Sequence, residues 1–152
     1  YPGWQPHLIR MLFDAIPGTR AIYIFRDLAD CVRSAKAWGE LHSEADTQQF
    51  CTQWAGHLRF MLQWQDSNPV LMLKYEELIK EPGRAIEQLR DFLPFEDMKS
   101  EVLQYKINNM TEGADSRRDH HNYIEPAALT ERESDFIEAA MKAVDSLPKT
   151  GS

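Results

Sequence analysis

The chain has 152 residues, of which 43% are hydrophobic and 27% are charged, and its formal net charge is −7. This length and composition are typical of one globular domain with a core of its own. The acidic balance argues against nucleic-acid binding, because that binding depends on a basic surface. No apolar run approaches the ~20 residues that cross a membrane, and the opening residues lack the pattern of a signal peptide, so we expect a cytoplasmic protein.

The hydrophobic pattern predicts helices that alternate with short strands. In chain order the expected elements are a helix over 6–16, a strand over 20–25, a helix from 27 or 28 to 39, a helix over 46–66, a strand over 70–75, a helix over 82–92, a short helix over 96–106, a loop over 108–126 and a final helix from 131. The final helix opens with a capping box, in which Thr130 and Glu133 can each satisfy a backbone amide of the other.

The long helix over 46–66 is amphipathic, and Asp46 or Thr47 is its expected N-cap. Its expected apolar face comprises Phe50, Trp54, Leu58, Met61, Leu62 and Gln65. Cys31 and Cys51 both fall in expected helices, where we predict reduced and packed thiols. The sequence has no spacing that is typical of a metal site.

The two strands indicate an α/β fold with a parallel sheet. The helices between them have the length of right-handed crossovers, and the second strand is continuously apolar, as in a parallel sheet that is covered on both faces. Two strands make a small sheet, so we expect an N-terminal segment or a partner chain to complete it. We expect one domain over 1–148, followed by a disordered tail over 149–152.

The boundary between the first strand and the next helix carries the most informative pattern. The strand ends in Arg26, at the carboxyl edge of the sheet, where α/β proteins hold anionic ligands. Its guanidinium can bind a phosphate with two hydrogen bonds, and Ser34 lies within about two helical turns of it. A strand-end ion pair for Arg26 and an exposed position for Ser34 explain the spacing equally well. Asp30 is expected to cap the helix or to orient Arg26.

Two blocks of the sequence resemble the sulfotransferases that use 3′-phosphoadenosine 5′-phosphosulfate (PAPS). Residues 21–34 are similar to that family's 3′-phosphate motif, a strand followed by Arg-[Asn/Asp]-Pro-x-Asp-x-x-x-Ser, with Leu28 in place of the proline. Residues 70–93 resemble the family's segment of a strand, Tyr-Glu-Asp-Leu, a proline and a helix. The resemblance extends loosely over residues 94–145.

The resemblance implies a P-loop NTPase-like three-layer sandwich with a parallel sheet, here in a partial, helix-rich version. It implies that Arg26 and Ser34 bind the 3′-phosphate of PAPS and that Tyr75 lies against the adenine, a core tyrosine being the alternative. Arg117 and Arg118 stand near the place of a family loop that covers the same phosphate; a plain solvated loop is the alternative. No metal is implied.

The sequence has no Gly-x-x-Gly-x-[Ser/Thr] run, the pattern with which the family grips the 5′-phosphosulfate, and it offers no residue that matches the family's catalytic base. We therefore expect the C-terminal portion of a sulfotransferase domain, which transfers a sulfuryl group from PAPS to a hydroxyl or amine acceptor. The alternative is a non-catalytic nucleotide-binding or protein-interaction remnant of that fold. Whether the chain alone is an enzyme stays open, and its catalytic residues are unknown.

Overall fold

The computed structural model describes residues 6–93 and 125–147. In chain order the elements are α1 (Pro6–Ala15), β1 (Ala21–Phe25), α2 (Leu28–Ala37), α3 (Glu44–Trp64), β2 (Val70–Lys74), α4 (Tyr75–Lys80), α5 (Pro82–Phe92) and α6 (Glu131–Asp145). The expected helix over 96–106, nearly all of the expected loop over 108–126 and the expected tail over 149–152 lie outside the described residues.

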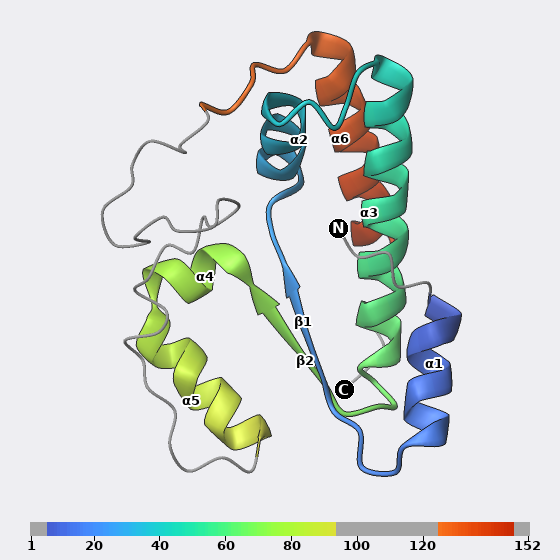
Figure 1. Cartoon of the computed structure of the whole chain (residues 1–152), viewed down its shortest axis with the longest axis vertical. Coiled ribbons are helices and arrows are strands. Elements are labelled where there is room, and N and C mark those ends of the chain that lie inside the picture. The colour runs from blue at the N-terminus through green and yellow to red at the C-terminus, as the bar shows by residue number, and fades with distance from the viewer. Residues whose placement is uncertain (1–5, 94–124, 148–152) are drawn as a thin grey trace, which may run out of the picture.

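The two strands lie between two groups of helices, with α2, α3 and α6 on one side and α4 and α5 on the other (Figure 1). Alternate side chains of the strands divide between these groups. Tyr23, Phe25 and Met72 pack against the core that α2, α3 and α6 form, whereas Leu71 and Leu73 pack with α4 and α5. The described part of the chain is therefore helix-rich and partly α/β, as expected.

The strands β1 and β2 pair in parallel, in a register that places Ala21 opposite Val70 and Phe25 opposite Lys74. The helices α2 and α3 form the crossover between them. Because parallel strands end at the same edge of a sheet, the residues that follow Phe25 and Lys74 emerge side by side. This register brings the two sequence blocks that resemble the sulfotransferases together.

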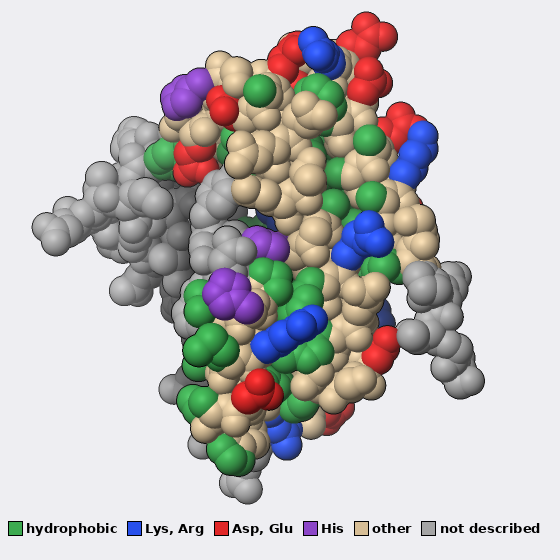
Figure 2. Space-filling model, turned by 90° about the vertical axis from the view of Figure 1, so that its right-hand side faces the viewer, with side chains coloured by type: hydrophobic (Ala, Val, Ile, Leu, Met, Phe, Trp, Pro, Cys, Tyr) green, Lys and Arg blue, Asp and Glu red, His purple; other side chains and the backbone are tan. Residues whose placement is uncertain are grey.

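Coverage of the sheet is uneven within the described residues. Ile22 and Ile24 lie opposite Leu71 and Leu73, on the face that α4 and α5 cover over β2, yet both isoleucines are exposed. On α1, Leu8, Met11 and Leu12 are exposed as well, as is Ile16 directly after this helix. Figure 2 shows hydrophobic side chains gathered on the lower part of the face that carries α1 and α3.

The helix α3 begins earlier than expected, because Ser43 is its N-cap. The Ser43 hydroxyl accepts a hydrogen bond from the amide of Asp46 at 3.2 Å, and the Asp46 carboxylate accepts one from the amide of His42 at 3.0 Å. The prediction of Asp46 or Thr47 as the N-cap is therefore wrong, since Ser43, Asp46 and Thr47 all have capping side chains and lie within five residues. Thr47 is buried instead.

The buried face of α3 is also rotated slightly from the expected one. Leu58 and Met61 are buried as predicted, but Phe50, Trp54 and Leu62 are half-buried at the flank of the core. The most buried residues of this helix are Thr47, Cys51, Ala55, Leu58 and Met61. Three of them, Thr47, Cys51 and Ala55, are small and let α6 pack closely on this helix, which the apolar pattern of a single helix does not indicate.

A buried ion pair fixes α2 to α6. Glu133 is only 4% exposed, and its carboxylate accepts hydrogen bonds from the Lys36 ammonium at 2.6 Å and from the amide of Thr130 at 2.8 Å. The Thr130 hydroxyl in turn accepts from the Glu133 amide, so the predicted capping box is confirmed. Lys36 also donates to the carbonyl of Ala128 at 2.9 Å. The capping box and the ion pair thus share one carboxylate.

We predict that Lys36→Met destabilises the fold by about 3 kcal/mol, because it leaves the Glu133 carboxylate buried without its counter-ion. Urea unfolding followed by circular dichroism measures this loss. Lys142→Met is the matched control: it removes a Lys–Glu pair of the same 2.6 Å length on α6, but both partners are exposed. Equal unfolding midpoints for the two variants would contradict the account of the buried pair.

The same carboxylate predicts a pH dependence. Burial alone would raise the pKa of Glu133, but the hydrogen bonds from Lys36 and Thr130 outweigh it and hold the pKa below its ordinary value of 4.5. The stabilisation is therefore complete above about pH 4.5 and is lost as the pH falls through the lower folded-state pKa. Unfolding free energies measured between pH 5 and pH 3, roughly the window of such a titration, should fall less steeply in Glu133→Gln than in the parent.

Candidate functional site

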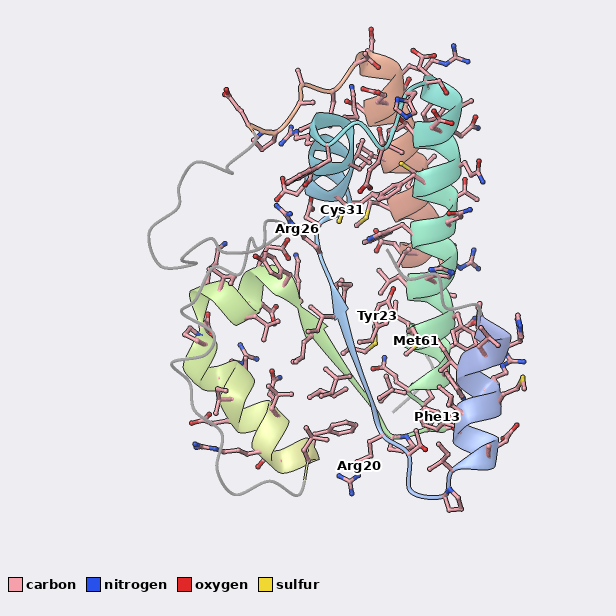
Figure 3. All side chains as sticks on the ribbon, in the orientation of Figure 1. Phe13, Arg20, Tyr23, Arg26, Cys31 and Met61 are labelled. Atoms are coloured by element: carbon pink, nitrogen blue, oxygen red, sulfur yellow. The ribbon has the colours of Figure 1, made fainter. Side chains whose placement is uncertain are left out.

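The turn between β1 and α2 positions Arg26. Arg26 follows the last residue of β1, and Asp27 caps α2 by accepting a hydrogen bond from the amide of Asp30 at 3.1 Å. Arg26 therefore lies at the carboxyl end of the strand and beside the N-terminus of α2, where the helix dipole favours an anion. In Figure 3 its side chain lies at the upper end of β1.

The side chain of Glu76, which follows the neighbouring strand β2, binds this turn. Its Oε1 accepts a hydrogen bond from the amide of Asp27 at 3.0 Å. Glu76 is the second residue of α4, a short helix that starts directly after β2. Glu76 thereby supports the turn. The helix α4 itself was not expected, and Tyr75 begins this helix instead of ending the strand.

The guanidinium of Arg26 is held from two directions. It lies over the Tyr75 ring, 5.4 Å from the ring centroid, and 3.7 Å separates its Nη2 from the Asp30 carboxylate. The side chain is 41% exposed, whereas its Nε atom is buried and without a partner among the described residues, as is Oε2 of Glu76. An oriented, partly exposed guanidinium with unused donors is suited to binding an oxyanion.

Ser34 lies on α2, four residues after Asp30, so the two side chains share one face of the helix. The Asp30–Arg26 ion pair places the guanidinium next to that same face. Ser34 is half-buried, and its hydroxyl has no hydrogen-bond partner among the described residues. The structure thus gathers Arg26, Asp30 and Ser34 along one side of the β1–α2 segment.

Tyr75 is 42% exposed, so it is not the core tyrosine that was the alternative. Its ring is the platform under the Arg26 guanidinium. Arg117 and Arg118 lie outside the described residues, and the structure does not place them relative to Arg26.

Cys31, one of the two cysteines predicted to be reduced, lies on α2 next to the turn as a free, half-buried thiol. Burial raises the pKa of its thiol to about 11, a rise that the nearby Arg26 opposes and the carboxylates of Asp27, Glu76 and Asp30 reinforce. The thiol is therefore protonated at neutral pH and is no nucleophile. Its Sγ is 4.0 Å from the Arg26 carbonyl, so it packs against the turn.

A concave region lies at the other end of β1. A largely apolar cavity of about 330 Å³ lies between α1, β1 and α3, and Phe13, Tyr23 and Met61 line it (Figure 3). Arg20 also lines the cavity, but its guanidinium donates to the carbonyl of Phe92 and lies over the Phe92 ring. This cavity lacks the set of polar groups that surrounds Arg26.

Neither a metal site nor a membrane-spanning helix is found in the described residues. In residues 6–93 and 125–147, no three metal-ligating side chains gather in one place. Across those same ranges, no helix has both the length and the apolar character that a bilayer crossing requires. The β1–α2 turn is therefore the candidate site, because it carries a partly exposed guanidinium beside a helix N-terminus.

Comparison with known proteins agrees with the two sequence blocks. A family model described as "Sulfotransferase domain" matches residues 7–142, which include β1, β2 and the whole β1–α2 turn. Searches of the curated proteins and of the solved structures give no match. Because the family match covers far more than half of the sequence, this chain belongs to the sulfotransferase domain family.

Proposed function

We propose that this chain is the 3′-phosphate-binding portion of a PAPS-dependent sulfotransferase with a P-loop NTPase-like, three-layer fold. The reaction would transfer the sulfuryl group of PAPS to a hydroxyl or amine acceptor. The observation that carries the proposal is the β1–α2 turn, where Glu76, Asp30 and Tyr75 orient Arg26 beside Ser34 in a chain of the sulfotransferase family. We also propose that residues 1–148 form one domain.

Each candidate residue has a role in this proposal. The Arg26 guanidinium and the Ser34 hydroxyl donate hydrogen bonds to the 3′-phosphate, and the N-terminus of α2 adds a favourable dipole. Tyr75 lies against the adenine while its ring still supports Arg26. Arg117 and Arg118 approach the same phosphate from the segment that precedes Glu125. The donors fit a phosphate, because the oriented Arg26 side chain is 41% exposed and the Ser34 hydroxyl is unpaired within the described residues.

The 3′-phosphate is a remote handle on the donor. Binding energy gained there holds the nucleotide in place, so that the sulfuryl group can be aligned with the attacking oxygen or nitrogen. Sulfuryl transfer resembles phosphoryl transfer, in which positioning and charge neutralisation do most of the catalytic work. The contribution of Arg26 and Ser34 is therefore positioning, at a distance from the bond that breaks.

In this proposal, residues outside this sequence bind the 5′-phosphosulfate. The 152 residues have no Gly-x-x-Gly-x-[Ser/Thr] run. An N-terminal segment or a partner chain would supply that loop and the general base. The exposed β1 residues Ile22 and Ile24 are compatible with such an addition to the sheet.

The missing loop also favours a second candidate function. A nucleotide-binding or protein-interaction module that keeps the 3′-phosphate site but has no transferase activity would need neither the loop nor a base. Both candidates require the chain to bind 3′,5′-diphosphoadenosine (PAP), the product of the donor. They differ in turnover once the missing segment is present.

We predict that the chain binds PAP at least about tenfold more tightly than 5′-AMP, since a phosphate that accepts charge-assisted hydrogen bonds contributes about 1.5–3 kcal/mol. Isothermal titration calorimetry of the whole chain with each nucleotide measures this preference. Equal affinities for the two nucleotides, or binding of neither, would contradict the proposed function.

We also predict that Arg26→Ala lowers the affinity for PAP by roughly 10- to 100-fold and Ser34→Ala by roughly 3- to 10-fold, as expected for a charged and a neutral donor. Arg10→Ala is the matched control for Arg26, because Arg10 lies over the Phe60 ring at 5.3 Å but at the opposite end of β1. Ser134→Ala, on α6, is the control for Ser34. Unchanged affinity in Arg26→Ala would remove the main support for the proposal.

A further inference from the structure

On α2, the Asp30 carboxylate lies between the guanidiniums of two arginines. Asp30 is 3.7 Å from Nη2 of Arg26 through one oxygen and 3.8 Å from Nη1 of Arg33 through the other. Arg33 is 45% exposed, about as much as Arg26 and Asp30. The two guanidiniums therefore face a common anion.

Helix geometry and the turn explain this arrangement. Asp30 and Arg33 are three residues apart on α2, so their side chains are neighbours on its surface. Arg26 precedes the helix, and the turn that Asp27 and Glu76 fix directs its side chain back toward Asp30. The two arginines approach Asp30 from opposite ends.

The other two carboxylates of the turn each accept a backbone amide through one oxygen. Glu76 accepts the amide of Asp27, and Asp27 accepts the amide of Asp30. Asp30 is thus the carboxylate that neutralises the arginines, and it does so weakly. Both nitrogen–oxygen distances exceed the hydrogen-bond range, so these contacts leave guanidinium donors unused. Exposed pairs of this kind contribute little to stability.

We propose that Arg33 is a second phosphate-binding residue, which grips the same phosphate dianion as Arg26 and raises the selectivity of the site for a 3′-phosphorylated adenosine nucleotide. Asp30 holds both guanidiniums in place until the phosphate takes up their free donors. Ser34 and Arg33 follow Asp30 by four and three residues on α2, so both are its neighbours on the helix surface, and the Ser34 hydroxyl can donate to the same phosphate. This inference rests on the proposed function, because it concerns the same site.

The phosphate has the geometry that Asp30 lacks. A carboxylate offers two oxygens, whereas a phosphate monoester dianion offers three, with more charge, and can accept a pair of hydrogen bonds from each of two guanidiniums. A nucleotide that lacks the 3′-phosphate gains nothing from Arg33. Arg33 therefore raises the affinity for PAP without raising the affinity for 5′-AMP.

The test compares Arg33→Gln, Arg33→Lys and the parent chain by calorimetric titration with PAP and with 5′-AMP. We expect Arg33→Gln to lower the affinity for PAP by about tenfold and to leave the affinity for 5′-AMP unchanged. The affinity of Arg33→Lys for PAP should lie between that of Arg33→Gln and that of the parent, since lysine keeps the charge but lacks the planar pair of donors. Raising the salt concentration should reduce the difference between Arg33→Gln and the parent.

Arg84→Gln is the matched control. Arg84 is also an exposed helix residue with a carboxylate three positions away, Glu81 at 3.7 Å, but it lies on α5. The affinity of Arg84→Gln for PAP should equal that of the parent.

The outcomes separate the inference from the proposed function. If Arg26→Ala loses PAP and Arg33→Gln stays within twofold of the parent, the proposed function stands and the role of Arg33 is wrong. An equal loss of PAP and 5′-AMP in Arg33→Gln would show damage to α2 and would also overturn the inference. If the parent itself does not prefer PAP, both the function and the inference fail.

Discussion

The structure of the site depends on one hydrogen bond, from the amide of Asp27 to the carboxylate of Glu76. This bond joins the carboxyl ends of the two parallel strands, and its two residues are 49 positions apart in the sequence. Because Asp27 is the N-cap of α2, the bond also fixes where that helix begins and how it is rotated. The placement of Arg26, Asp30 and Ser34 follows from that rotation.

The charges around the turn are compatible with the proposed anion site, although the protein is acidic. Glu76 and Asp27 each accept a backbone amide, which uses their negative charge to order the turn. Asp30 meets Arg26 only at ion-pair distance, and Tyr75 supports the guanidinium through its ring. Most of the binding energy for a phosphate therefore stays available, because the guanidinium donors are ordered without being fully satisfied.

Local signals in the sequence predicted most of the described fold, including both strands, the helix that follows Arg26 and the capping box at Thr130. The helix α4 was missed because six residues do not complete two turns of apolar periodicity. Ser43 was missed as a cap because Asp46 has the same capping chemistry three residues later. The approach of Arg26 and Arg33 to the same carboxylate, Asp30, could not be predicted from the sequence. It depends on the conformation of the turn, and the spacing of these residues is equally typical of a solvated helix face.

The central claim is that the β1–α2 turn presents the Arg26 guanidinium to the 3′-phosphate of the nucleotide. Nitrogen-15 NMR of the arginine side chains, recorded during a titration of the chain with PAP, tests it most directly. The account predicts that the Nε–H resonance of Arg26, whose Nε is buried and unpaired among the described residues, shifts in a saturable way with PAP and much less with 5′-AMP. An Arg26 resonance that stays in place while PAP binds elsewhere on the chain would contradict it.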